Sequence, residues 1–280
     1  MNVVSEEQAK LAARAKAAEA LYGSPFRLHI TRLAPEYIRR FCPPRADVLD
    51  VGCGSGRYAL FFIEAGIGGS YLGIDINPRR WEKAIAPPSF SVRFREWNAH
   101  EVGELGESFD FVISLTAFEH FADDARVMRG VAQALKAGTH ALVVVPAKYS
   151  YPLYGKHGYR RYARRDVGEL AKQAGLEIVE LRAVGGLAGW LFHFTWFFPA
   201  QVLRAGAKAI FYSLFGFQRD KARHAWPRLA RFLERLGQHH LDWRWGRALH
   251  RGGLICSEKL DRFLPLFEVG YLAVLRRPRS

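Results

Sequence analysis

The sequence predicts an α/β protein with a doubly wound, mostly parallel seven-stranded sheet and a helical insert between the last two strands. Three observations predict this fold. Short apolar runs of strand type alternate with helical patterns five or six times along the first two thirds of the chain. A glycine cluster directly follows the first run. A stretch of different composition, residues 185–266, then precedes a final strand pattern. With 280 residues, 49% of them apolar, the chain fits one large domain with an insertion.

Each strand is expected from a short apolar run bounded by turn residues. The parallel strands are expected at 47–51, 70–75, 90–95, 109–115 and 141–145. Residues 177–183 and 268–275 also have strand patterns. These two segments are expected to form an antiparallel pair at one edge of the sheet.

Helices are expected at 5–22, 34–41, 56–66, 122–136 and 164–174, with another after Pro78. Pro35 suits the first turn of its helix, where a missing N–H costs nothing. Gly138 and Gly175 are placed to end the helices before them, because glycine readily adopts the left-handed conformation found there. The chain thus divides into an N-terminal helical cap (1–44), a core (45–184), an insert (185–266) and a final strand with its tail (267–280).

The glycine cluster lies where a ligand can approach the backbone. Residues 48–56 read Val-Leu-Asp-Val-Gly-Cys-Gly-Ser-Gly, after a strand and before a helix. Glycines there permit positive φ and close approach of a ligand, although a glycine trio alone could be a plain tight turn. Asp75 ends the next strand, where an acid can accept hydrogen bonds from the two hydroxyls of a ribose. The combination favours a nucleoside-containing ligand.

Dinucleotide binding uses the same topology and is the first alternative. Its fingerprint, Gly-x-Gly-x-x-Gly/Ala, fails because Arg57 occupies the position of the last small residue. Asp50 is poorly placed beside a pyrophosphate but suits a cationic amino group. S-adenosylmethionine has that amino group and no phosphate, so the residues favour it over NAD.

These residues resemble motif I of the class I S-adenosylmethionine-dependent methyltransferases, of the type 11-like kind. The likeness extends over roughly 45–184 and the final strand. It includes Asn98-Ala99 in place of the Asp-Ala pair that commonly contacts adenine, and the fourth-strand segment 109–120. The resemblance implies S-adenosylmethionine as the cofactor. The implied cofactor-binding residues are Asp50, Gly52, Cys53, Gly54, Gly56, Asp75, Ile76, Asn98, Ala99, Ser114 and Leu115.

Two segments offer catalytic candidates. Glu119 and His120 follow the fourth strand at the edge of the sheet where open α/β folds bind ligands. His157 lies in a long polar and aromatic loop after the fifth strand. Each histidine could act as a base toward a hydroxyl acceptor. Glu119 and His120 could equally form a structural hydrogen-bonding pair, and the loop could simply be packed by its tyrosines.

The same loop offers candidates for binding the acceptor. Tyr159, Arg160 and Arg161 are the expected substrate-binding residues, and the two arginines could clamp a phosphate or carboxylate. The loop resembles a stretch found in a poorly characterised branch of methyltransferases. That likeness identifies no acceptor.

The insert is both apolar and basic. The formal net charge of the chain is +14, and residues 185–266 hold 13 Lys and Arg against 5 Asp and Glu, a net charge of +8. Residues 187–203 carry no charge but include His193, Pro199 and Gln201, which argue against a simple membrane span. In the expected helix at 224–236, Trp226, Leu229, Leu233 and Leu236 lie on one side, and Arg228, Arg231 and Arg235 lie largely on another. This pattern favours an anionic membrane surface over nucleic acid.

Two other roles of the insert stay open. Its helices could instead form a lid over the pocket or a homodimer interface. Cys42, Cys53 and Cys256 show neither metal-ligand spacing nor a disulfide framework, so no metal site is predicted. The N-terminal segment lacks the features of a signal peptide. We therefore expect a cytoplasmic protein, with peripheral contact at the inner face of the membrane as a hypothesis.

The sequence as a whole predicts methyl transfer from S-adenosylmethionine to an oxygen or carbon atom of an apolar, isoprenoid-like or lipid-linked small molecule. Two alternatives remain at this point. One is an NAD(P)-dependent oxidoreductase, and the other is a non-catalytic, membrane-associated protein that retains the fold.

Overall fold

The computed structural model describes residues 25–77, 90–150, 158–216, 218–235, 244–263 and 266–279. The helices expected at 5–22 and after Pro78 lie outside these residues. The chain divides into two compact units, one built on Phe26–Val184 with the C-terminal strand and one built on Gly185–Phe267.

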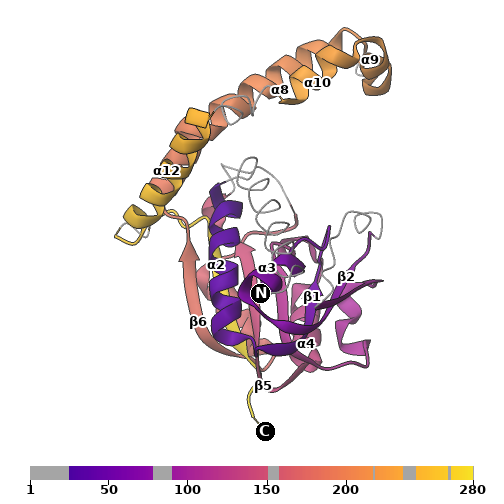
Figure 1. Ribbon diagram of the computed structural model, residues 1–280, viewed down its shortest axis with the longest axis vertical. Coiled ribbons are helices and arrows are strands. Elements are labelled where there is room, and N and C mark those ends of the chain that lie inside the picture. The colour runs from indigo at the N-terminus through magenta and orange to yellow at the C-terminus, as the bar shows by residue number, and fades with distance from the viewer. Residues whose placement is uncertain are drawn as a thin grey trace, which may run out of the picture. The chain divides into compact units, whose positions relative to one another are not determined.

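A seven-stranded sheet forms the first unit, as predicted (Figure 1). Its order is β3-β2-β1-β4-β5-β7-β6, and only β7 is antiparallel to its neighbours. The strands are β1 (Arg45–Val51), β2 (Gly68–Asp75), β3 (Phe90–Glu96), β4 (Phe109–Leu115), β5 (Leu135–Pro146), β6 (Glu177–Val184) and β7 (Gly270–Arg276). The pairing of β6 with β7 at one edge is the antiparallel pair expected from the sequence.

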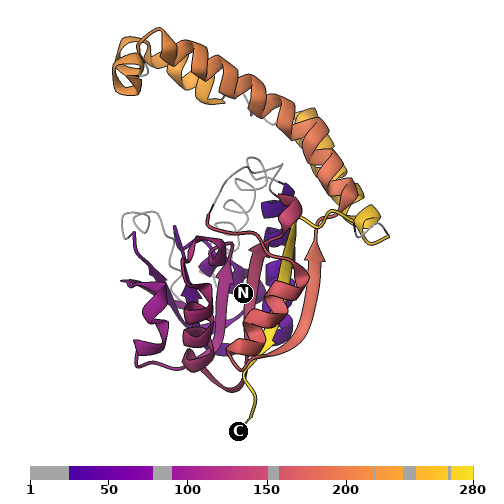
Figure 2. The same ribbon diagram turned by 180° about the vertical axis from the view of Figure 1, so that it is seen from behind.

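Helices cover both faces of the sheet. Figures 1 and 2 show α2 on one face and α6 on the other. The helices and 3-10 turns of this unit are α2 (Pro25–Phe41), α3 (Ala59–Ala65), η2 (Ala99–Glu104), η3 (Phe118–His120), α4 (Asp124–Ala134), η4 (Lys148–Ser150) and α6 (Arg164–Gln173). Because β1 and β4 are neighbours while β2 and β3 lie beyond β1, the strand order reverses between β1 and β4. Ligands of open α/β sheets bind at such a point.

The helix predicted at 34–41 is longer than expected. It begins at Pro25, so Pro35 lies inside α2 rather than in its first turn. An interior proline costs a helix about 3 kcal/mol. The helix continues because one apolar face runs through it, with the buried side chains Phe26, Ile30, Leu33, Tyr37 and Ile38 at helical spacing. Burial of this face against the sheet offsets the loss at the proline.

The predicted role of Gly138 is wrong. Helix α4 ends at Ala134, and the chain enters β5 at the fully buried Leu135. Gly138 does have a positive φ of 78°, but it lies within β5 and its N–H donates to the carbonyl of Arg277. The start of a buried strand therefore ended the helix before the glycine was reached. Gly175, with φ 72°, does follow α6 as predicted.

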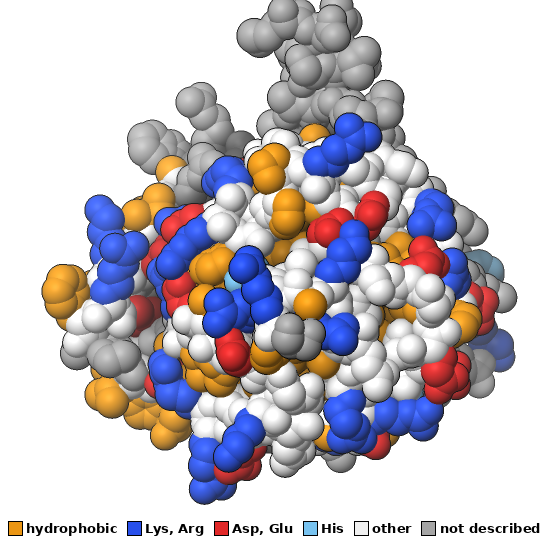
Figure 3. All heavy atoms as spheres, turned by 90° about the horizontal axis from the view of Figure 1, so that it is seen from below, with side chains coloured by type: hydrophobic (Ala, Val, Ile, Leu, Met, Phe, Trp, Pro, Cys, Tyr) orange, Lys and Arg blue, Asp and Glu red, His pale blue; other side chains and the backbone are white. Residues whose placement is uncertain are grey.

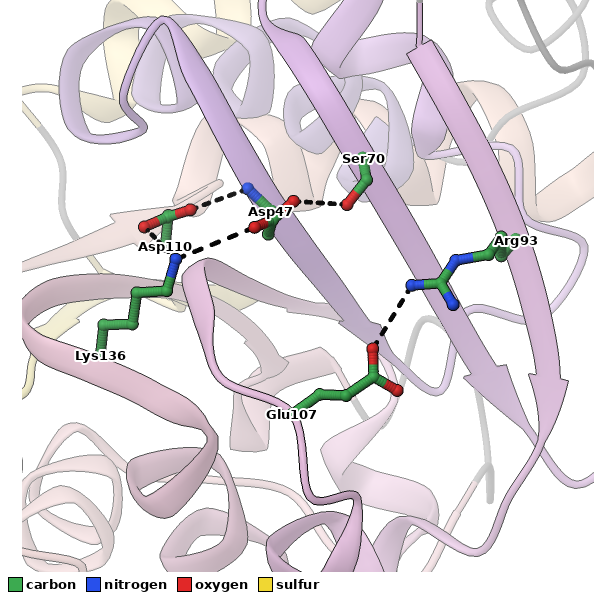
Figure 4. A network of polar contacts seen from close by, with 6 residues as sticks. All are labelled: Asp47, Ser70, Arg93, Glu107, Asp110 and Lys136. Carbon is green, nitrogen blue, oxygen red and sulfur yellow. Dashed lines mark hydrogen bonds and ion pairs between the residues drawn. The ribbon is translucent and has the colours of Figure 1, made fainter.

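Polar contacts join the strands at the end of the sheet opposite the ligand edge (Figure 4). The Ser70 hydroxyl donates to Asp47 at 2.6 Å, and Lys136 donates to Asp110 at 2.8 Å. In Figure 3, which views the molecule from below, Lys and Arg side chains are interspersed with Asp and Glu. This pattern is typical of a solvated surface.

The second unit is a helical hairpin. Its helices are α7 (Leu187–Phe192), the π-helical turn η5 (His193–Phe197), α8 (Phe198–Ser213), α9 (Arg219–Ala225), α10 (Pro227–Arg235) and α12 (Arg244–Asp261). Helix α8 packs against α10, and α7 packs against α12. The π turn precedes Pro199, whose ring would clash with the carbonyl four residues earlier in a regular helix. Asp261 accepts hydrogen bonds from the N–H groups of Ala188 and Gly189, which caps α7. No helix among the described residues is long and apolar enough to cross a membrane.

Helix α2 should be essential to the stability of the core. We expect Ile38→Ala, at a fully buried position, to lower the free energy of unfolding by about 2–5 kcal/mol, because it leaves a cavity. Glu36→Ala, at an exposed position two residues away, should change it by less than about 0.5 kcal/mol. Urea unfolding of both variants measures the difference. Equal effects would show that α2 does not belong to the core.

Candidate cofactor and active site

The glycine loop follows β1 and is held by the tip of β2. The N–H groups of Gly52 and Cys53 donate to the carbonyl of Ile74 at 2.9 and 3.0 Å. The N–H of Gly54 donates to Asp75 Oδ2 at 2.9 Å. These bonds fix the loop against the neighbouring strand at the point where the strand order reverses.

The three glycines predicted in this loop have distinct roles. Gly52, Gly54 and Gly56 all have positive φ, at 74°, 56° and 70°. A Cβ on Gly52 would lie 2.6 Å from the Cβ of Ala117, so this position has no room for a side chain. A Cβ on Gly54 would meet nothing within 4 Å. The loop is therefore tightly packed on its β4 side and open above Gly54, as a backbone cradle for a ligand must be.

Asp50 lies beneath this loop in an unusual environment. Its side chain is fully buried, and Oδ2 accepts a short hydrogen bond from the Tyr71 hydroxyl. Its Oδ1 atom has no hydrogen-bond partner among the described residues. Burial raises the pKa of Asp50 from 3.8 to about 7, while the Tyr71 bond lowers it and the charge of Asp75 raises it. An unpaired, buried carboxylate oxygen is suited to a cationic partner.

Asp75 ends β2 with its carboxylate partly exposed. Oδ2 holds the loop at Gly54, and Oδ1 accepts the N–H of Asn77 at 2.9 Å. A carboxylate has about four acceptor positions, so two stay available for hydroxyl donors. Ile76 is exposed next to it and offers an apolar surface. The positions of Asp75 and Ile76 are both compatible with the ribose contact expected from the sequence.

Asn98 and Ala99 lie after β3, at the start of η2. The Asn98 side chain caps that turn by accepting the N–H of His100 at its Oδ1 atom. His100 Nε2 in turn accepts the N–H of Asp123 at 3.2 Å. His100 thus joins Asn98 to the start of α4, a role that the sequence did not reveal.

The end of β4 is the third part of the candidate cofactor site. Ser114 is buried and donates to the carbonyl of Val51 at 2.8 Å, which ties β4 to β1, and Leu115 is buried beside it. Thr116 follows with a φ of 57°, a strained conformation for a β-branched residue. Such strain is concentrated at functional sites. In the sequence, the one indication that Thr116 belongs to the site was its position directly after the expected fourth strand.

Glu119 and His120 form a close pair in η3. Glu119 is buried, and its Oε2 atom has no hydrogen-bond partner among the described residues. Burial raises the pKa of Glu119 from 4.5 to about 7, although the positive charge of Arg161 lowers it. His120 is exposed, with Nε2 3.9 Å from Glu119 Oε1. The pair therefore combines a buried acid of near-neutral pKa with an exposed imidazole.

The structure brings the second predicted segment next to this pair. The N–H of Tyr159 donates to the carbonyl of Glu119 at 2.6 Å. Gly158 has a φ of 75°, and a Cβ there would lie 2.4 Å from that carbonyl oxygen. Only glycine fits at this approach. His157, the other predicted base, lies outside the described residues.

The three predicted acceptor-binding residues differ in their surroundings. Arg160 forms an ion pair with Asp124 and donates to the carbonyl of Ala122 at 2.6 Å. These bonds give Arg160 a structural role in joining the loop to α4, beside the Tyr162 hydroxyl, which donates to Asp124 at 2.8 Å. Arg161 is half-buried beside Glu119, and Tyr159 is exposed. Tyr159 and Arg161 are thus the better candidates for meeting an acceptor.

The arrangement fits S-adenosylmethionine. The unpaired Asp50 oxygen suits the amino group, the open backbone at Gly54 leaves room for the ligand, and Asp75 can receive the ribose hydroxyls. These features lie on adjacent strands at the reversal point of the sheet. Fold and site together define an S-adenosylmethionine-dependent methyltransferase.

Comparison with known proteins agrees with the assignment of this chain as a methyltransferase. Residues 26–181, more than half of the chain, match the family described as "Methyltransferase domain". The chain belongs to this family. The match includes the glycine loop, Asp75 and the Glu119–His120 pair, and it favours methyl transfer over the dinucleotide alternative.

Several similar proteins are named as ubiquinone biosynthesis O-methyltransferases. The chain is 28% identical over 186 residues to a ubiquinone biosynthesis O-methyltransferase of Dinoroseobacter shibae, covering 58% of this chain and 74% of the relative. A protein of the same name from Nitrosospira multiformis is 26% identical, over 48% of this chain and 64% of the relative. One from Pseudomonas aeruginosa is 28% identical, over 48% and 66%. The matched part of the chain thus covers between 64% and 74% of the length of these three relatives.

Solved structures show the fold. A crystal structure of the cyclase SpnF matches with a TM-score of 0.55 and 17% identity, over 89% of this chain and 82% of that one. A methyltransferase of Bacillus halodurans matches with a TM-score of 0.52 and 15% identity, over 88% and 98%. Because the first protein is named a cyclase, the fold alone does not assign an activity.

We expect Asp75→Ala to weaken S-adenosylmethionine binding by about 1–3 kcal/mol, because it removes a charged acceptor and frees Gly54. Isothermal titration calorimetry measures the change. Asp47→Ala, at the opposite end of the neighbouring strand β1, is the matched control and should bind as the unaltered protein does. Unchanged affinity in Asp75→Ala would remove Asp75 from the site.

Asp50 should destabilise the ligand-free protein at alkaline pH. Its native pKa of about 7 exceeds its ordinary value of 3.8, so the native state binds more protons than the unfolded state between these values. Stability therefore falls as pH rises from about 4 to 7 and changes no further above 7 from this group. Asp50→Asn, which can keep the Tyr71 bond, should raise the melting temperature at pH 8 by a few degrees and weaken cofactor binding. A lower melting temperature at pH 8 would contradict this account of Asp50.

Proposed function

We propose that the protein transfers a methyl group from S-adenosylmethionine to a hydroxyl oxygen on the ring of an isoprenoid-bearing quinone precursor. The similarity to ubiquinone biosynthesis O-methyltransferases from several bacteria carries this proposal. The sequence had left oxygen and carbon acceptors open. The relatives favour oxygen, and the Glu119–His120 pair supplies the proton acceptor that a hydroxyl requires.

The cofactor, when bound, supplies a methyl group on a sulfonium, which is already activated toward an oxygen nucleophile. The residues of the chain then have two tasks, to orient the reactants and to accept a proton. Asp50, Asp75 and the glycine loop hold the cofactor. Tyr159 offers an exposed aromatic surface for the ring of the acceptor.

His120 takes the proton of the acceptor hydroxyl in this proposal, because it is the exposed member of the pair. Glu119 lies behind it and stabilises the resulting imidazolium. A separation of 3.9 Å exceeds a hydrogen bond, but such contacts often shorten when substrates bind. Arg161 biases Glu119 toward its charged form by lowering its pKa against the effect of burial. Gly158 and Tyr159 hold the loop on Glu119.

The proposed acceptor is tested with purified protein, labelled S-adenosylmethionine and a short-chain polyprenyl catechol. Transfer of label to the ring oxygen, located by mass spectrometry, supports the proposal. Label on a ring carbon would exclude O-methylation. Oxidation of NAD(P)H without label transfer would support the dinucleotide alternative instead.

The rate of methyl transfer should rise with pH through about 7, as Glu119 loses its proton and can stabilise the imidazolium of His120. We expect His120→Gln to lower kcat by about 100-fold and to flatten the pH profile, since the base is gone. Glu119→Gln should lower kcat less and remove the rise near pH 7, because the group with the pKa of about 7 is gone.

His100→Gln is the control, because His100 lies on the adenine side and has no part in the proton transfer proposed here. Its pH profile should keep the shape of the unaltered enzyme. A full-rate His120→Gln enzyme with an unchanged profile would remove this pair from the mechanism and leave His157 as the candidate base.

A further inference from the structure

We propose that the helical hairpin at 185–267 binds the surface of an anionic lipid bilayer through one apolar face, formed by exposed side chains of α8, α10 and α12. The face consists of Leu203 and Ile210 on α8 with Leu214 directly after it, Leu229 on α10 with Trp226 directly before it, and Leu249 and Leu260 on α12 with Phe263 two residues after it. This inference concerns the hairpin alone and does not depend on the identity of the methyl acceptor.

A hairpin two helices thick cannot bury all its apolar residues. Its interior is small, with Phe211, Tyr212, Ala222 and Ala230 forming one cluster. The arms meet closely at their other end, where a Cβ on Gly253 would lie 2.3 Å from the ring of Phe192. Many large apolar side chains of the hairpin are accordingly exposed, among them Leu203, Ile210 and Leu260.

Helix α8 shows most clearly that apolar side chains of the hairpin are exposed. Leu203, Ile210 and Leu214 are 63%, 69% and 77% exposed and lie at helical spacing on one side of the helix axis. None of its exposed residues whose side chains the structure describes is charged. Exposed apolar side chains that gather on one side of a helix often mark an interaction site.

Helix α12 carries a second stripe of the same kind. Leu249, Cys256, Leu260 and Phe263 are exposed, at spacings of 7, 4 and 3 residues along one side. The buried residues of the helix lie on another side, with Ser257 about a quarter turn and Leu254 more than a third of a turn away. The stripe is therefore separate from the contact between the arms.

The stripes lie on a common side of the hairpin. In α10 and α12 the exposed apolar residues are rotated by about a quarter turn from the residues that face the other arm, and in the same sense. Helix α8 shows a similar rotation, and it packs against α10 in the opposite chain direction (Figure 1). Two antiparallel helices with the same rotation present their stripes on the same side. The stripes thus form one apolar face of the hairpin, and Val202, Phe232 and Ile255 are further exposed apolar residues outside it.

Charge selects a lipid surface as the occupant. The hairpin has a net charge of +8, which attracts an anionic bilayer, whereas a second copy would add another +8. Arg228 and Lys259 are exposed about a quarter turn from the apolar stripes, where a long side chain can reach a lipid phosphate. Arg231 lies on the far side of α10. A helix is about 10 Å across and the Debye length is about 8 Å, so its attraction is weakened but not lost.

The test uses the full-length protein and vesicles of phosphatidylcholine with and without phosphatidylglycerol, and no methyl acceptor. We expect sedimentation with the anionic vesicles. The combined variant Leu203→Gln, Ile210→Gln, Leu214→Gln should reduce the bound fraction at least about tenfold, because each side chain loses its apolar burial. Ala205→Gln with Ala209→Gln, exposed positions of α8 away from the stripe, is the matched control and should bind normally.

The charge contribution is measured with Arg228→Gln and Lys259→Gln together. This variant should bind anionic vesicles about tenfold more weakly and show a smaller preference for phosphatidylglycerol, because the net charge of the hairpin falls from +8 to +6. Unchanged binding of S-adenosylmethionine in every variant shows that the core is intact.

Three outcomes would overturn the proposal. The first is equal sedimentation of the unaltered protein and the triple variant. The second is a dimer in analytical ultracentrifugation that the triple variant abolishes without any vesicle binding, which would make a second copy the occupant. The third is a change in methyl-transfer kinetics in the triple variant without vesicles, which would favour a lid.

Discussion

The hydrogen bond from the Gly54 N–H to the Asp75 carboxylate connects the two segments on which the candidate site depends. It joins the loop after β1 to the tip of β2 and fixes the backbone that a cofactor would approach. The positive φ values of the loop glycines make this geometry possible, and the packing of Gly52 against Ala117 extends it to β4. Asp75 thus holds the loop while keeping acceptor positions for a ribose. A substitution at this position acts on the loop and on the ligand together.

Beneath that loop, the protein buries a carboxylate that it does not fully satisfy. Asp50 has one oxygen bonded to Tyr71 and the other unpaired, and its pKa is raised to about 7 by burial. Glu119 at the end of β4 shows the same combination of burial, an unpaired oxygen and a pKa of about 7. Both acids lie near the reversal point of the sheet. Perturbed acids at such a position are typical of functional sites, where stability is lost in exchange for binding or catalysis.

The sequence predicted the sheet and the glycine loop after β1 well, because buried parallel strands and a glycine loop have local signatures. Contacts between distant residues were harder to predict. The partnership of Asp50 with Tyr71 depends on the register of β1 and β2, and the contact between Glu119 and the loop at Gly158 joins segments 39 residues apart. The two wrong predictions of helix ends, at Pro35 and at Gly138, were both caused by tertiary packing. Burial of the α2 face carried the helix through Pro35, and the buried Leu135 ended α4 before Gly138.

We infer that the loop after β1 and the acid at the tip of β2 bind S-adenosylmethionine. Calorimetric titration of S-adenosylmethionine into the full-length protein, repeated with an excess of NADH, measures this binding. We expect saturable binding at one site per chain, unaffected by NADH. Binding of NADH instead, or no heat of S-adenosylmethionine binding from a protein that still unfolds cooperatively, would contradict it.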